Sequence, residues 1–167
     1  MLTRSMQMLG AVLLAAGLAA GAQSGPKIDA CKKIDAAAVT AAASGWFSAP
    51  VTFTVNSAQG KTAGTCDYQT EAPKHIEISI YYAPDVNVRM YALGENLKPG
   101  ETLVAGVGDK AVFGLDDNSG SQYKSEKLSF LKGKAVMILT LNLDRKLPTV
   151  TKEKLADFAT KQLVPQL

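Results

Sequence analysis

The chain has 167 residues, a length that fits one domain with a hydrophobic core of its own. It contains one histidine and two cysteines, which excludes a metal site with two histidine ligands and any site built from four cysteines. Aromatic residues make up only 7% of the chain, too few for a platform of stacked rings that binds nucleic acid. The 18 basic and 15 acidic residues are interspersed without a basic stripe, so nucleic acid is not expected as a partner.

Residues 1–22 have the pattern of a secretory signal peptide. Arg4 is the only charge, an apolar run follows over residues 8–18, and Ala20-Gly21-Ala22 supplies the small residues that signal peptidase needs. The apolar run is too short to cross the hydrocarbon core of a bilayer comfortably. We therefore predict a cleaved signal, with an uncleaved membrane anchor as the alternative.

Cleavage after Ala22 leaves a single domain over residues 23–167, with a mobile lead at residues 23–28. We expect this domain in the periplasm or outside the cell, without stable membrane insertion. In an oxidising compartment the only two cysteines, Cys31 and Cys66, are expected to pair as a structural disulfide. A redox-active pair is the alternative, but such pairs usually have Cys-x-x-Cys spacing.

The first expected element of the domain is a short helix rich in alanine. Asp35 is a good N-cap for residues 36–44, and Gly45 stands where a left-handed residue would end the helix. Two strands should follow. Residues 51–55 alternate apolar and polar side chains with the period of a half-buried strand, and residues 64–68 form the next strand.

The third strand, over residues 76–82, has the clearest alternation. One face should be buried (Ile76, Ile78, Ile80 and Tyr82) and the other carries Glu77, Ser79 and Tyr81. Residues 85–93 change to helical spacing and predict a middle helix that stops at Gly94. A fourth strand is expected over residues 111–115, followed by a loop rich in turn residues over 116–120.

A hairpin and a helix complete the chain. Residues 127–131 and 135–143 should pair around a turn at Lys132-Gly133, and the second of these strands is apolar enough on both faces to be central. Thr151 should cap a final helix that ends at Pro165, with a buried stripe of Leu155, Phe158, Ala159 and Leu163. The pattern predicts an α+β fold, with a mostly antiparallel sheet of five to seven strands and N-terminal, middle and C-terminal flanking helices.

Two short motifs resemble ligand-binding loops but lack the flanking helix or the final ligand that such loops need. Residues 106–111 match G-x-G-x-x-[GA], but a strand follows them where a dinucleotide site needs a helix. They are better explained as a tight turn whose glycines take positive φ. Residues 116–120 resemble the start of a calcium loop, yet the last ligand position is Lys127 instead of glutamate. We expect neither a cofactor nor a metal ion.

His75 and the paired aromatic residues are the remaining candidates for a site. His75 lies beside Lys74 just before a strand, a position typical of a surface residue. Because it is the only histidine in the chain, acid–base catalysis by an imidazole would have to use it. Trp46, Tyr81 and Tyr82 each adjoin another aromatic residue. One member of each pair should be exposed if the chain is extended, because neighbouring side chains then point to opposite faces. Such aromatics are candidate contacts for a ligand or partner.

Taken together, several features resemble a group of small exported bacterial domains of unknown function that are common among actinobacterial lipoproteins. The features are Cys31 before Ile34-Asp35 and the alanine-rich helix, Cys66-Asp67-Tyr68, residues 104–111, the Lys-Gly hairpin and the closing helix. The chain is also similar, more distantly, to PsbP-like lipoproteins and to sensor domains of mycobacterial kinases. The resemblance implies a sheet with flanking helices, a Cys31–Cys66 bridge and a groove for a ligand. The chain departs from it because no cysteine stands at the cleavage point to carry a lipid anchor.

These observations favour a non-catalytic exported domain that binds a small molecule, an envelope component or a protein partner. A groove between sheet and helix, lined by Trp46 and Tyr81 or Tyr82, would serve that role. One alternative is a small periplasmic hydrolase or transferase that uses His75. The other is an inhibitor that inserts the loop over residues 116–120 into an envelope enzyme.

Overall fold

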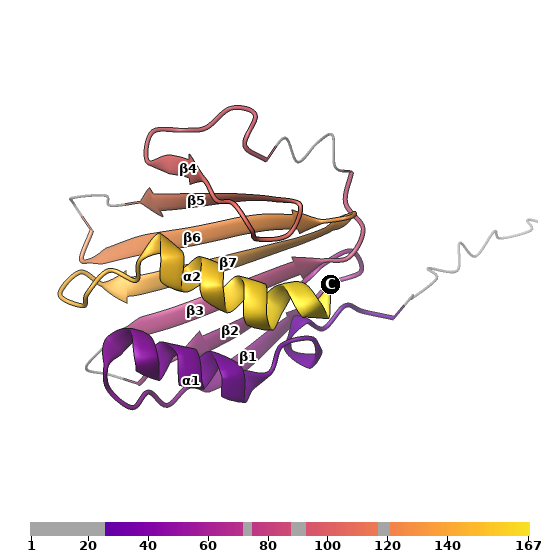
Figure 1. Ribbon diagram of the computed structural model, residues 1–167. Coiled ribbons are helices and arrows are strands. Elements are labelled where there is room, and N and C mark those ends of the chain that lie inside the picture. Colours follow the sequence, from indigo (N-terminus) through magenta and orange to yellow (C-terminus); the bar gives the residue numbers. More distant parts are fainter. Residues whose placement is uncertain (1–25, 72–74, 88–92, 117–120) are drawn as a thin grey trace, which may run out of the picture.

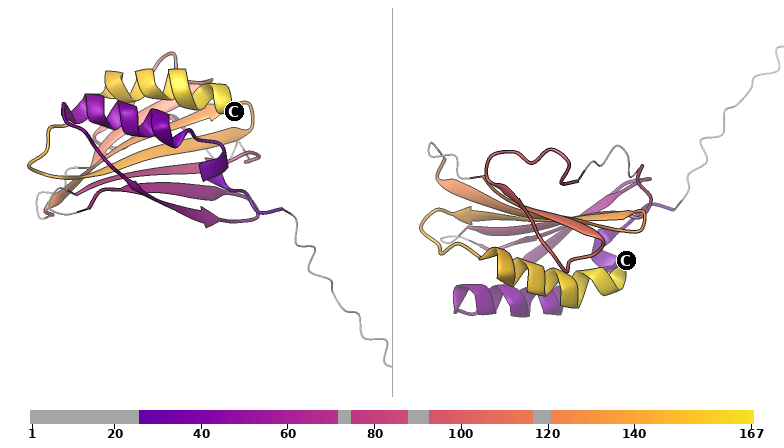
Figure 2. Two further views of the ribbon diagram at one scale, coloured as in Figure 1. Left: turned by 90° about the horizontal axis from the view of Figure 1, so that it is seen from below. Right: turned by 45° about the horizontal axis from the view of Figure 1, so that its top comes forward.

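A computed structural model describes residues 26–71, 75–87, 93–116 and 121–167. In this part of the chain, a single antiparallel sheet of seven strands carries two helices, α1 and α2, on the same face (Figures 1 and 2). The fold is therefore α+β and mostly sheet. No helix among these residues is long and apolar enough to cross a membrane.

The strands pair in the order β1-β2-β3-β7-β6-β5-β4, and every neighbouring pair is antiparallel. Their bounds are β1 Thr54–Gln59, β2 Gly64–Gln69, β3 Ile76–Ala83, β4 Glu101–Leu103, β5 Lys110–Asp116, β6 Tyr123–Lys132 and β7 Ala135–Asp144. The chain builds β1 to β3 as a meander, crosses to the far edge at β4, and returns strand by strand. The last strand, β7, therefore lies at the centre, as its apolar character predicts.

Two helices cover the sheet. The first, α1, runs over Ala36–Phe47 behind a short 3-10 turn at Ala30–Lys32. The second, α2, runs over Lys152–Phe158 and continues through a π-helical turn at Ala159–Leu163, before the 3-10 turn that contains Pro165. The predicted caps are confirmed: the side chains of Asp35 and Thr151 accept the backbone N–H groups of Ala37 and Lys154.

The core lies between the sheet and the two helices. The predicted inward faces of β3 and β7 are confirmed: Ile76, Ile78, Ile80, Tyr82, Ala135, Met137, Leu139, Leu141 and Leu143 are all buried. The predicted stripe of the last helix is buried as well (Leu155, Phe158, Ala159 and Leu163). Trp46 of α1 packs edge-on against Phe158 with 5.4 Å between ring centroids, which joins the two helices through one aromatic contact.

A disulfide ties the start of α1 to the sheet. Cys31, in the turn before α1, is bonded to the fully buried Cys66 of β2, with Cα atoms 4.9 Å apart. The predicted pairing of Cys31 with Cys66 is thus present in the structure. It holds the N-terminal segment over the β2 strand.

The first strand is displaced from its predicted position. The strand ladder begins at Thr54 and continues to Gln59, whereas the alternation predicts a strand over residues 51–55. Val51 is buried below α1 and its N–H donates to Ser44 Oγ at 3.1 Å. Residues 49–53 therefore form the segment that connects α1 to the sheet. Their apolar and polar residues alternate because Val51 is buried under the helix, and not because the segment pairs as a strand.

The hairpin turn is also shifted by one residue. Lys132 pairs with Ala135, so the turn is Gly133-Lys134 and not Lys132-Gly133. Gly133 takes φ = 59°, as two-residue hairpin turns require. The predicted middle helix falls largely on residues 88–92, and the loop over 116–120 largely on residues 117–120, which lie outside the described residues.

The end of α1 differs from the prediction that Gly45 stops it. The helix continues to Phe47, and Ser48 takes the left-handed conformation with φ = 51°. Ser48→Gly should therefore stabilise the protein by roughly 0.5–1 kcal/mol, because glycine adopts this conformation without strain. Gly45→Ala should stabilise it by a similar amount, since the position is helical and nothing lies within 4 Å of an added Cβ. Thermal unfolding of both variants checks this, and a destabilising Gly45→Ala would contradict the helix end described.

Candidate functional site

A cleft of about 420 Å³ lies beside the C-terminal end of α1. It opens where the descent from α1 to β1 separates from the ends of β2 and β3. Its walls come from three separate stretches of the chain: Phe47, Ala49, Pro50, Val51, Thr52, Phe53, Thr54, Thr70, Glu71, Ile76 and Leu147. Its volume falls within the range of small-molecule sites.

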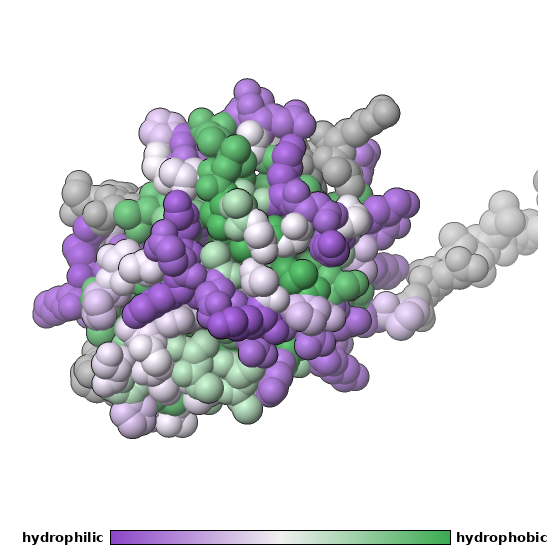
Figure 3. Space-filling model, in the orientation of Figure 1, coloured by the Kyte–Doolittle hydropathy of each residue, from purple (hydrophilic) through white to green (hydrophobic). Residues whose placement is uncertain are grey.

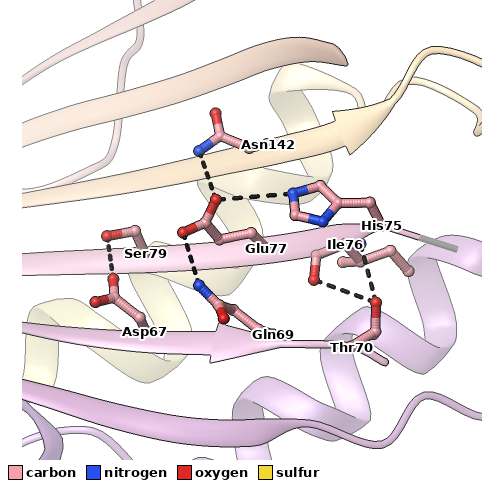
Figure 4. A network of polar contacts seen from close by, with 8 residues as sticks. All are labelled: Asp67, Gln69, Thr70, His75, Ile76, Glu77, Ser79 and Asn142. Atoms are coloured by element: carbon pink, nitrogen blue, oxygen red, sulfur yellow. Dashed lines mark hydrogen bonds and ion pairs between the residues drawn. The ribbon is translucent and has the colours of Figure 1, made fainter. Parts of the chain in front are cut away.

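The cleft has an apolar interior and a polar rim. Phe47, Val51, Phe53, Ile76 and Leu147 supply the apolar surface, while three threonines and Glu71 supply hydroxyl and carboxylate groups. Phe53 is held edge-on against the buried Tyr68, with 6.0 Å between ring centroids. The Thr70 hydroxyl accepts the N–H of Ile76 at 3.0 Å (Figure 4). These contacts hold Phe53 and Thr70 in place in the wall of the cleft.

Tyr68 supports the wall behind Phe53. Its hydroxyl is buried and has no hydrogen-bond partner among the described residues. Burial raises the pKa of Tyr68 to about 12, with a further contribution from the negative charge of Asp35. Tyr68 is therefore neutral at physiological pH and acts as a packing residue behind the cleft.

Two buried charged residues of β6 hold the loop that carries Leu147. Lys124 Nζ donates to the carbonyl oxygen of Leu147 at 2.8 Å and to Thr149 Oγ1 at 2.9 Å. The carboxylate of Glu126, fully buried, accepts the N–H of Val150 at 3.1 and 3.0 Å. Burial raises the pKa of Glu126 to about 7, although the Val150 N–H and Lys124 favour its charged form. These two side chains thereby position one wall of the cleft.

The three predicted aromatic contacts do not line this cleft. Trp46 is buried between α1 and α2, where it lines a shallower hollow with Phe158. Tyr82 is buried on the side of the sheet that faces the helices, with Lys33 Nζ 5.9 Å from its ring centroid. Tyr81 is half-buried on the opposite face. The structure therefore does not bring Tyr81 together with the other two.

His75 belongs to a polar network on the face opposite the helices (Figure 4). Its Nε2 atom is 3.9 Å from Glu77 Oε2, and its ring lies against Tyr123 with 4.7 Å between centroids. Glu77 is already bound by two amides, from Gln69 and Asn142, each at 3.1 Å. The network therefore links β2, β3 and β7, and His75 sits at its end without a short hydrogen bond to the carboxylate.

The glycine motif over residues 106–111 forms the predicted tight turn before β5. Gly106 and Gly108 have φ of 80° and 59°, and a Cβ on Gly108 would stand 2.2 Å from the carbonyl oxygen of Leu131. Asp109 accepts the N–H of Gly133 at 2.7 Å and Lys132 Nζ at 3.1 Å, and these bonds lower its pKa. The turn therefore anchors the β6–β7 hairpin.

The surface over the two helices shows how the polar and apolar groups are distributed (Figure 3). A hydrophilic band follows α2, and a paler, weakly apolar area covers the alanine-rich α1. Among the described residues, no three side chains of His, Cys, Asp or Glu gather in a way that could hold a metal ion.

Comparison of the chain with protein-family models, with characterised proteins and with solved structures found no match.

Proposed function

We propose that the protein is an exported, non-catalytic binding domain whose ligand occupies the cleft beside the end of α1. The cleft itself carries this proposal, because it combines a ligand-sized volume with a largely apolar lining and a few polar groups. The signal-peptide pattern and the disulfide support an exported location.

The lining indicates the chemistry of the ligand. Phe47, Phe53 and Leu147 suit an apolar or aromatic body. Among the described residues that line the cleft, Glu71 is the one that carries a charge, and the threonines there both donate and accept hydrogen bonds. A small molecule with an apolar body and an uncharged or positively charged polar group fits this arrangement, whereas an anion would face the Glu71 carboxylate.

The uncharged probe N-phenyl-1-naphthylamine tests the proposal, since its fluorescence rises in apolar surroundings. We expect saturable binding to one site. Thr52→Trp, at an exposed position of the rim, should fill part of the cleft and weaken binding about ten-fold, a loss of about 1.4 kcal/mol. The readout is a fluorescence titration.

Thr102→Trp is the matched control, because Thr102 is an exposed threonine on β4, at the far edge of the sheet from β1. This variant should bind the probe like the unaltered protein. Loss of binding in both variants, or in neither, would show that the cleft is not the site.

The His75 hydrolase or transferase is the weaker alternative. His75 does not line the cleft, and Glu77 lies beyond hydrogen-bond distance from it. The inhibitor alternative depends on residues 116–120, most of which lie outside the described residues. The structure therefore offers the enzyme and the inhibitor alternatives less support than the cleft offers the binding domain.

A further inference from the structure

The two edge strands of the sheet differ in their protection against pairing. β4 has only three residues, follows Lys98-Pro99, and begins with the charged Glu101. β1 has six residues, all exposed, none of them charged and none proline. Edge strands are usually shortened, charged or interrupted by proline, because their free N–H and C=O groups pair with other strands. β4 has this protection and β1 lacks it.

β1 is also held ready for pairing. Among the described residues it has a neighbouring strand on one side only, β2. The carboxylate of Asp29 accepts Ser57 Oγ and Gln59 Nε2, each at 2.9 Å, which fixes the C-terminal half of the strand. Val55 exposes 44% of its surface. The strand therefore offers an ordered, uncharged edge whose binding would cost little conformational entropy.

We propose that β1 is a dimerisation surface on which the β1 strand of a second copy pairs antiparallel about a twofold axis. A centre at Asn56 pairs this residue with Asn56 of the other copy and places Val55 opposite Ser57 and Thr54 opposite Ala58, so that paired side chains share one face of the sheet. No charged residues oppose each other in this register. The two sheets become one continuous sheet, with the same patch used by both copies, as twofold symmetry requires.

The charges beside the strand favour a second copy as the occupant. Near the Gln59 end of β1, Lys27 and Lys61 outweigh the one carboxylate of Asp29 and leave a net positive charge, and Glu71 lies beyond the Thr54 end. Lys27, Lys61 and Glu71 are exposed. Antiparallel pairing about a twofold axis brings the positive end of each copy beside the negative end of the other, an arrangement that selects this orientation.

Sedimentation equilibrium of the purified protein over a range of concentrations tests the proposal. We expect a reversible monomer–dimer equilibrium. Val55→Lys places two lysines in the symmetric interface and should raise the dissociation constant about ten-fold or more. Leu103→Lys is the matched control, since Leu103 is an exposed apolar residue on the other edge strand, and it should leave the equilibrium unchanged.

Ala58→Lys repeats the test at a second exposed position of β1 if Val55→Lys does not fold. Circular dichroism and thermal unfolding confirm that each variant is folded. A protein that stays monomeric at the highest concentration overturns the proposal. So does a dimer that Leu103→Lys weakens as much as the β1 variants, or that neither β1 variant affects.

Discussion

Loss of the Cys31–Cys66 bond should lower the free energy of unfolding by roughly 3–4 kcal/mol, because the bond closes a loop of 35 residues in the unfolded chain. That is a large fraction of the stability of a small domain. The measurement is urea-induced unfolding of the protein with and without a reducing agent. The reduced protein should unfold at a clearly lower urea concentration.

The double variant Cys31→Ala, Cys66→Ala separates the cross-link from the chemistry of free thiols. Cys66 is fully buried, so alanine leaves a small space without adding a polar group. The variant should match the reduced protein and should be insensitive to reductant. Equal stability of oxidised and reduced protein would contradict the structural role of the bond.

The second large effect concerns Glu126 and pH. Its folded pKa, about 7, lies above the ordinary value, so the folded state holds its proton more tightly than the unfolded state. Stability should therefore fall as pH rises from about 4.5 to about 7, by about 3 kcal/mol at most, and stay low above that range. The physical cause is the cost of a buried negative charge.

Glu126→Gln removes this titration while keeping an oxygen that accepts the Val150 N–H. The stability gained by Glu126→Gln over the unaltered protein should be small near pH 4 and grow towards pH 8. Urea unfolding across this pH range measures the difference, so the effects of other titrating groups cancel. A difference that does not change with pH would show that Glu126 is not the buried, proton-holding group described.

Glu153→Gln is the control of opposite sign. Glu153 is exposed in the first turn of α2, where a backbone N–H and the Thr151 hydroxyl lower its pKa. Its charge contributes stability above the ordinary pKa of glutamate and loses that contribution as the pH falls. Glu153→Gln should therefore cost stability at pH 8 and little at low pH.

Most of the sheet could be predicted from local patterns. The alternation along β3 and β7 directly reflects one buried face, and the caps Asp35 and Thr151 act on neighbouring backbone groups. The displacement of β1 had no local signal. Thr54–Gln59 pairs through its backbone at an exposed edge, so its side chains carry no alternation.

The candidate site could not be found in this way. The residues that line the cleft range from Phe47 to Leu147, and only the tertiary fold brings them together. Lys124 and Glu126 look like ordinary surface charges in a polar stretch. Their burial arises because the loop before α2 folds over β6 and supplies the carbonyl and N–H groups that bind them. The α1 helix likewise continues past Gly45 to Phe47, and this last turn carries Trp46, which packs against Phe158 of the distant α2.

The pairing of β3 with β7 has a consequence for when the chain can fold. The partners Ile76 and Leu143 are 67 residues apart in sequence, and Ala83 and Val136 are 53 apart (143 − 76 and 136 − 83). Contacts between such distant segments form late and slow down folding. The meander of β1 to β3 thus waits for one of the last segments to be synthesised. In a chain built in this way the core can close only after the C-terminal part is available for pairing.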